Sequence, residues 1–260
     1  MKLWDKNNSV NEKIIEFTVG DDRLNDLYLI KYDVKASISH AKMLYRSNLL
    51  SEIECDKIIN ILNEILSQAE AGELKIEKEF EDMHSKIEYI LTDKLGDIGK
   101  KIHTARSRND QVLVSIQLYL IDELNFIKAE VKSLFDLLIN LAKKNKNIIM
   151  PGYTHMRAAM PSSFGLWFSA YAEILIDDVI SLNSTIEIIN QNTLGSAAGY
   201  GTSFNIDRDF TTNDLNFKTL KYNSLACQIS RNKIEKNTFD TLGNIAFTLS
   251  KISMDICLYS

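Results

Sequence analysis

Residues 150–165 read MPGYTHMRAAMPSSFG and hold both prolines of the chain. The sequence on either side has the apolar spacing of long helices. Proline fixes φ and removes a backbone donor, and glycine relaxes φ, so helical structure must stop within this stretch. Because a helix connection needs only about two to five residues, the presence of Thr154, His155 and Arg157 needs a further reason. Two interpretations stay open: an active-site loop with His155 as its main side chain, or a proline-punctuated connection with a hydrogen-bonded histidine.

The sequence before this stretch predicts one very long helix, because residues 110–146 contain neither glycine nor proline. Ser107 with Asp110 three residues on is a capping-box pattern that opens it. Its apolar residues step by threes and fours, close to the 3.5-residue period of a coiled-coil seam. They are Ile116, Leu120, Leu124, Ile127, Val131, Leu134, Leu138 and Leu141. A helix of roughly 35 residues is about 50 Å long, so it must pack against other long helices, including those of other copies of the chain.

The sequence after residue 161 predicts two more long helices, over 162–190 and 230–260, with a short helix within 207–226. Between them lies the small-residue stretch NTLGSAAGYGTSFNIDR, residues 192–208. Its glycines allow backbone amides to approach an anion closely. An irregular connection between helices, without a ligand, is the alternative.

Three further helices are predicted near the N-terminus, over 23–47, 51–69 and 80–95. Ser51 begins the second of them, since Glu54 three residues later completes a capping box. Asp82 and His84 lie in the first turn of the third. They are either an acidic turn that favours the helix dipole or a carboxylate and an imidazole that face a substrate pocket.

Composition bounds the class of protein. The 260 residues are 45% hydrophobic and 25% charged, as in soluble globular proteins. Two prolines and ten glycines are too few for the turns of an all-β protein and favour long helices. A net charge of −5 without a basic stripe argues against nucleic-acid binding. There is no run of membrane-span length and no apolar core of a signal peptide.

The polar clusters suggest a chemistry without a metal. Three cysteines without a CxxC pair argue against a zinc site and favour a reducing cytoplasm. Arg106 and Arg108 precede a long helix, where guanidinium groups and free amides suit a carboxylate. Thr154 and His155 can bind a second anionic group or move a proton near neutral pH. A cofactor-free reaction on a polycarboxylate follows as a hypothesis.

Five stretches of the chain resemble one enzyme family in order and spacing. They are FTVGDDRL at 17–24, EDMHSKIE at 81–88, HTARSRNDQV at 103–112, PGYTHMRAAMPSSFG at 151–165 and LGSAAGYGTSFNIDR at 194–208. Together they resemble argininosuccinate lyase, of the fumarase/aspartase superfamily. SRNDQ together with GYTH separates this lyase from adenylosuccinate lyase, fumarase and aspartase.

The resemblance implies a mainly α fold of the superfamily's long-helix bundle type. It implies an N-terminal helical domain over 1–102 and the first part of the central bundle over 103–260. Four such bundles form a twenty-helix core in a homotetramer. The family cleaves argininosuccinate to arginine and fumarate in the cytoplasm, in arginine biosynthesis, without a cofactor or metal. A base removes a proton next to a carboxylate, an aci-carboxylate forms, and an acid protonates the departing guanidino nitrogen.

The resemblance also implies site residues. Ser107, Arg108 and Asn109 would bind the carboxylate region of the substrate. Thr154 would contact a carboxylate, and His155 would be the catalytic histidine, as an acid or a relay.

Further positions match the family less fully. Asp82 and His84 match its EDxH and would line the pocket, and Thr18 stands where the family commonly has a substrate-contacting serine. Arg157 and Met160 replace glutamines that are common in the family. Arg157 can depress the pKa of the neighbouring histidine, bind a carboxylate or point away, and these alternatives stay open.

The family's serine loop, GSSxMPxKKN, and its C-terminal small domain are expected after residue 260. The chain thus resembles about the first half of the enzyme, and we expect little or no lyase activity from these 260 residues alone. Two alternatives remain: a non-catalytic helical assembly protein derived from this family, or another lyase of the superfamily such as adenylosuccinate lyase.

Overall fold

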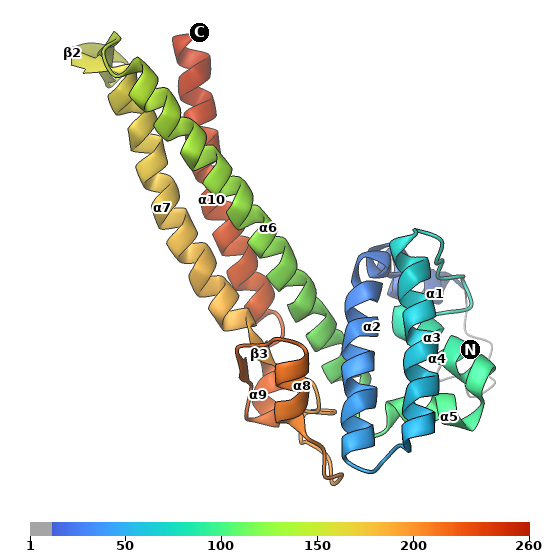
Figure 1. Cartoon of the computed structure of the whole chain (residues 1–260). Coiled ribbons are helices and arrows are strands. Elements are labelled where there is room, and N and C mark those ends of the chain that lie inside the picture. Colours follow the sequence, from blue (N-terminus) through green and yellow to red (C-terminus); the bar gives the residue numbers. More distant parts are fainter. Residues whose placement is uncertain (1–11) are drawn as a thin grey trace. The chain divides into compact units, whose positions relative to one another are not determined.

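The computed structural model describes residues 12–260 and is mainly α-helical, as predicted (Figure 1). Its helices are α1 Glu12–Val19, α2 Asp22–Arg46, α3 Glu52–Glu70, α4 Met83–Leu95, α5 Asp97–Lys100, η1 Lys101–His103, α6 Arg108–Asn145, α7 Phe164–Ile189, α8 Arg208–Asp214, α9 Ser224–Ile229 and α10 Lys233–Tyr259. Its strands are β1 Ile149–Thr154, β2 Arg157–Ser163, β3 Gln191–Asn192 and β4 Thr219–Leu220. None of the described helices combines the length and the apolar character that crossing a bilayer requires.

Contacts within the chain divide it into two compact units. The first unit comprises the described residues up to Tyr119 together with Asn190–Arg231, and the second comprises Leu120–Ile189 and Asn232–Ser260. The helix α6 contributes its first part to one unit and the rest to the other. The domain boundary after residue 102, expected from the sequence, stays a prediction.

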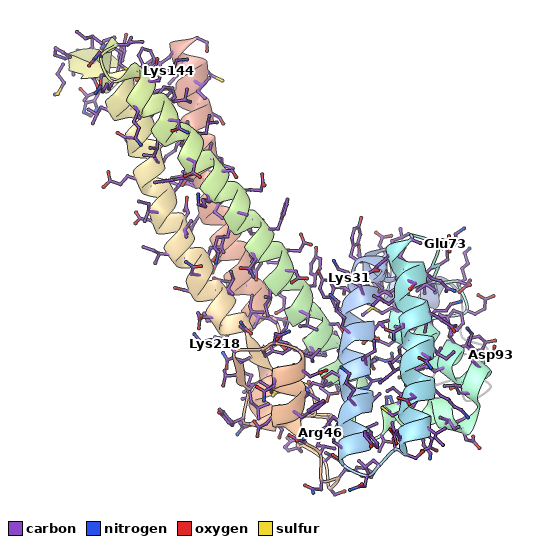
Figure 2. The ribbon with its side chains drawn as sticks, in the orientation of Figure 1. Lys31, Arg46, Glu73, Asp93, Lys144 and Lys218 are labelled. Atoms are coloured by element: carbon purple, nitrogen blue, oxygen red, sulfur yellow. The ribbon has the colours of Figure 1, made fainter. Side chains whose placement is uncertain are left out.

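The first unit is built around a core between α2, α3 and α4. Large aliphatic side chains of these helices are fully enclosed, among them Ile30, Val34, Leu44, Ile58, Leu62, Ile65, Ile87 and Leu91. The capping box predicted for α3 is confirmed: Glu54 N donates to Ser51 Oγ at 3.3 Å, and Ser51 N donates to Glu54 Oε2 at 3.0 Å. Charged side chains such as Glu73 and Asp93 remain on the outer surface of this unit (Figure 2).

The second unit is a bundle of the long helices α6, α7 and α10 (Figure 1). The predicted 35-residue helix is confirmed and slightly exceeded, because α6 has 38 residues. Polar bonds tie α7 to α10: Trp167 Nε1 and Tyr171 Oη donate to Asp255 Oδ2 at 3.0 and 2.6 Å. Deeper in the bundle, Thr248 Oγ1 donates to the buried Asp178 at 2.7 Å.

The proline-flanked stretch, for which the sequence left an active-site loop and a proline-punctuated connection open, is a β-hairpin. The helices stop where expected, but β1 and β2 pair antiparallel and place Pro151 opposite Pro161. His155 and Met156 form the turn with φ of 51° and 62°. Positive φ at both central residues is the geometry of a two-residue type I′ hairpin. Because neither residue is glycine or asparagine, the sequence carried no ordinary signal for this turn.

Residues 190–231 are less regular than the long helices. They contain two short helices, α8 and α9, where the sequence predicted one. Strands β3 and β4 pair in parallel over two residues each. Arg208 holds this region together, since its guanidinium group donates to the carbonyl oxygens of Leu194 at 2.9 Å and Lys221 at 3.1 Å.

Candidate active site

The N-terminus of α6 is capped by its own side chains, as the sequence predicted. Ser107 Oγ accepts a hydrogen bond from Asn109 N at 3.3 Å, and Ser107 N donates to Asp110 Oδ1 at 2.9 Å. These bonds fix the backbone of the first turn. Three candidate substrate contacts, Ser107, Arg108 and Asn109, therefore lie together at one helix end, each partly exposed.

The second carboxylate oxygen of Asp110 binds backbone amides of the small-residue stretch at 192–208. Asp110 Oδ2 accepts hydrogen bonds from Gly195 N at 2.9 Å and Ala197 N at 3.0 Å. Among the described residues, the anion at these amides is thus a carboxylate of the chain itself. Burial raises the pKa of Asp110, while the amide bonds and the charge of Arg106 oppose that rise. Asp110 joins the start of α6 to this stretch.

Gly195 is required at this junction for two reasons. Its φ is +83°, which only glycine adopts readily. A Cβ atom there would also lie 2.9 Å from side-chain carbons of both Ile206 and Arg208. The local sequence therefore permits the close approach of the Gly195 amide to Asp110.

Arg108 brings together two sequence segments that lie more than twenty residues apart. Its Nη1 lies 3.3 Å from Asp82 Oδ1, and its Nη2 lies 3.4 Å from Ser85 Oγ and 4.0 Å from Glu88 Oε2. Asp82 also caps α4, because its Oδ1 accepts from Ser85 N at 2.7 Å. The side chain of Arg108 is 25% exposed, so the charge is oriented by α4 and still reaches the surface.

His84 is held inside the first unit and not on its surface. Its side chain is 3% exposed, and Nδ1 lies 3.0 Å from Oδ1 of the fully buried Asp33. This is an ion-pair distance without the alignment of a hydrogen bond. Sequence reasoning missed Asp33. The available signal was a carboxylate on the apolar face of α2, beside Ile30 and Val34, where an acidic residue needs a partner.

Arg106 is buried as well, which differs from the anion-binding role that the sequence suggested for it. Its Nη1 donates to Ser37 Oγ at 2.9 Å. Its charge stabilises two buried carboxylates, because it opposes the rise in pKa of both Asp33 and Asp110. Arg106 therefore balances charge inside the unit, whereas Arg108 presents it.

A further carboxylate lies at the start of α4. Asp26 Oδ2 accepts a hydrogen bond from Met83 N at 2.9 Å. Burial raises the pKa of Asp26 to about 6; the Met83 bond opposes the rise, and the charge of Asp82 adds to it. Thr18, on α1, is exposed and donates to the carbonyl of Ile14 at 2.9 Å, so its role as a substrate contact stays a prediction.

Thr154 and His155 belong to the second unit, in the turn between β1 and β2, and both are exposed. Arg157 pairs with Thr154 across the hairpin and is exposed too. Arg108 begins α6, whereas the hairpin follows its end. A helix of 38 residues is about 57 Å long at 1.5 Å per residue.

The family model described as Lyase matches residues 15–260 of this chain. The chain belongs to the lyase family. Argininosuccinate lyase of Phocaeicola vulgatus is 50% identical over 259 residues, which cover 100% of this chain and 58% of that protein. Argininosuccinate lyase of Thermotoga neapolitana is 44% identical, with 65% of its length covered. The chain thus spans about three fifths of the length of the curated relatives it matches, and the resemblance found in the sequence is confirmed.

Solved structures confirm the fold of this lyase-family chain. EDDS lyase in complex with formate superposes with a TM-score of 0.82 at 23% identity, over 89% of this chain and 45% of that chain. A class II fumarase from Schistosoma mansoni superposes with a TM-score of 0.77 at 19% identity, over 94% and 60%. The long-helix bundle of the fumarase/aspartase superfamily is therefore the fold of this chain.

Proposed function

We propose that this chain supplies substrate-binding and proton-transfer residues to a lyase that cleaves argininosuccinate to arginine and fumarate. The observation that carries the proposal is the capped N-terminus of α6, where Ser107, Arg108 and Asn109 lie together beside the acidic start of α4. The names of the most similar curated relatives support the choice of substrate.

The start of α6 suits a carboxylate of the substrate. The dipole of a helix favours negative charge at its start. Arg108 adds a fixed guanidinium group, since its contacts with Asp82 and Ser85 restrict its position. Removing a proton next to a carboxylate places a second negative charge on it. Donors already in place stabilise that charge without reorganising.

His155 is proposed to protonate the departing guanidino nitrogen or to relay a proton to it. The type I′ turn presents its imidazole outward on a rigid two-strand support. Thr154, next to it, is proposed to bind a carboxylate. Because about 57 Å of helix separates the two ends of α6, we propose that the hairpin of one copy meets the α6 start of another.

Assembly into a homotetramer is part of this proposal. The second unit exposes large apolar side chains along its long helices. They include Leu166 at 64%, Ile180 at 59%, Phe239 at 72% and Phe247 at 62%. An open groove of about 560 Å³ between α6 and α7 is lined by Val131, Phe135, Leu175, Ile176 and Val179, and also by the charged residues Lys128, Lys132 and Asp136. Surfaces of this kind favour association.

The cytoplasm is the proposed compartment of the reaction. Cys55, Cys227 and Cys257 are free thiols, a state that suits a reducing environment.

A chimera tests the proposed reaction. Residues 1–260 would replace the matching part of the Phocaeicola vulgatus enzyme, whose remaining segment is kept; this protein is called the chimera below. Fumarate release from argininosuccinate would be measured, with adenylosuccinate as the competing substrate. We expect turnover of argininosuccinate alone. A folded chimera that acts only on adenylosuccinate, or on neither substrate, would contradict the proposal.

A further inference from the structure

Asp33 is a buried carboxylate on α2 to which the proposed chemistry gives no role. Its side chain has no exposure. Burying a charge is costly unless the group is paired and hydrogen-bonded, so its surroundings show what keeps it there. Those surroundings come from α4 and α6, the two helices whose first turns carry the candidate substrate contacts.

Both oxygens of Asp33 are engaged. Oδ1 lies 3.0 Å from His84 Nδ1 and accepts from Ser115 Oγ at 3.3 Å, while Oδ2 accepts from Gln111 Nε2 at 3.3 Å. Burial raises the pKa of Asp33, but Arg106, Gln111, Arg108 and Ser115 all oppose that rise. Each hydroxyl or amide neighbour donates to the carboxylate, which favours the charged form.

We propose that Asp33 is a positioning residue that holds His84 with a proton on Nδ1 and leaves Nε2 as the ring nitrogen available to a ligand. The inference deepens the proposed function, because it rests on α4 and α6 forming the substrate pocket. In a neutral imidazole one nitrogen donates and the other accepts, and the partner of one nitrogen sets the state of the other. Nδ1 is the nitrogen enclosed by the protein.

Other charges around His84 do not replace Asp33. Asp82, the N-cap of α4, and Glu88 of α4 are already paired with Arg108 at 3.3 and 4.0 Å. Asp26 of α2 accepts from the backbone of Met83. Arg106 is a cation and cannot accept a proton from the ring. Asp33 Oδ1, at 3.0 Å, is thus the carboxylate oxygen beside His84 Nδ1, and a small rotation of the imidazole ring would align the two for a hydrogen bond.

His40, on the same helix as Asp33, is an internal reference, because its proton is expected on Nε2 and not on Nδ1. Its Nε2 lies 2.9 Å from the carbonyl oxygen of Thr104, which only accepts, so the proton is on Nε2. Burial lowers the pKa of His40 to about 3, and the charge of Arg106 adds to the lowering. His40 is therefore neutral at pH 7 with its proton on Nε2, whereas His84 is expected to carry one on Nδ1.

The test is nitrogen NMR of the 260-residue chain labelled with 15N-histidine, recorded at pH 7. The chain has four histidines, and His84→Gln and His40→Gln assign the two buried rings by loss of their signals. We expect a protonated Nδ1 for His84 and a protonated Nε2 for His40 in the unmodified chain. In Asp33→Asn, which keeps the size of the side chain and removes its charge, the fraction of His84 rings with the proton on Nδ1 falls, because a neutral amide oxygen accepts less strongly than a carboxylate, and His40 is unchanged.

Asp178→Asn is the matched control, because Asp178 is a buried carboxylate of the second unit that accepts from Thr248 Oγ1 at 2.7 Å. It should leave both histidine signals in place. A His84 ring protonated on Nε2 alone in the unmodified chain overturns the inference, even if Asp33→Asn fails to fold. An unchanged His84 signal in folded Asp33→Asn overturns it as well. Neither measurement needs turnover, so an inactive chimera would count against the proposed reaction and leave this result standing.

Discussion

The candidate residues of the first unit and those of the second are held in opposite ways. Arg108 contacts Asp82 and Ser85, and His84 lies against a buried carboxylate. Thr154 and His155 are exposed at the tip of a hairpin, where the paired backbone of β1 and β2 positions them. The first unit thus orients its groups by side-chain contacts within the chain. The second presents groups on a rigid support, which fits a site completed by another copy.

The largest expected effect concerns Asp110, the buried carboxylate that joins the start of α6 to Gly195 and Ala197. Asp110→Ala leaves the amides of Ser107, Gly195 and Ala197 without their acceptor. We expect the unfolding free energy of the first unit to fall by about 3–5 kcal/mol, measured by urea denaturation. Asp93→Ala, an exposed position on α4 (Figure 2), should change it by less than about 0.5 kcal/mol. If Asp110→Ala lowers the unfolding free energy by less than about 1 kcal/mol, the bonds of Asp110 are not needed to stabilise the first unit.

The next effect concerns activity and not stability. In the chimera, Arg108→Ala removes the guanidinium group proposed to bind the carboxylate. We expect kcat/KM for argininosuccinate to fall by about 100- to 1,000-fold, the usual loss for one preorganised donor. Arg46→Ala is the control, because Arg46 is exposed in the last turn of α2 (Figure 2) and its guanidinium group lies over the ring of Phe210. Equal losses in the two variants would remove Arg108 from the substrate site.

Two glycine substitutions, one in each unit, should change stability by smaller amounts and in opposite directions. Gly195→Ala places a Cβ against Ile206 and Arg208 at a positive φ, and we expect a loss of about 1–3 kcal/mol in stability. Gly243→Ala, in the open middle of α10 in the second unit, should instead gain about 0.5–1 kcal/mol. Thermal unfolding of both variants gives the signs. If both substitutions change stability in the same direction, Gly195 is not more constrained than Gly243.

The smallest effect is a pH dependence. Because the pKa of Asp26 is raised to about 6 in the folded chain, the folded state binds its proton more tightly than the unfolded state does. Stability should therefore fall as pH rises from about 4 to 6. Asp26→Asn keeps an acceptor for Met83 N and removes the charge, so it should gain about 1 kcal/mol at pH 7, a value limited by partial solvent exposure. Urea midpoints at pH 4.5 and pH 7 would show this, and an equal effect at both would contradict it.

The helices could be predicted from the sequence because their signals are local. The apolar spacing predicted 23–47 and 51–69, and the structure has Asp22–Arg46 and Glu52–Glu70. The hairpin could not be predicted, because its turn is made by His155 and Met156, which adopt positive φ without being glycine or asparagine. There the pairing of two strands overrides the preference of single residues.

The site could be predicted only in part, for the same reason. Ser107 and Asn109 could be placed together from the sequence, because both lie at the predicted start of one helix. The contact between Arg108 and Asp82 joins residues 26 positions apart, and Gln111 reaches Asp33 across 78 positions. A single sequence holds no distances, so Asp33 and the anion at Gly195 became visible only in the folded chain.

We propose that the start of α6 and the hairpin act in one site although they come from different copies of the chain. Two chimera variants, Arg108→Ala and His155→Ala, would be prepared separately, shown to have strongly reduced activity, and then dissociated and reassembled together. We expect mixed assemblies to regain lyase activity, because some sites receive an intact Arg108 from one copy and an intact His155 from another. Mixed assemblies that form, as shown by native mass spectrometry, and yet keep the reduced activity would contradict the proposal.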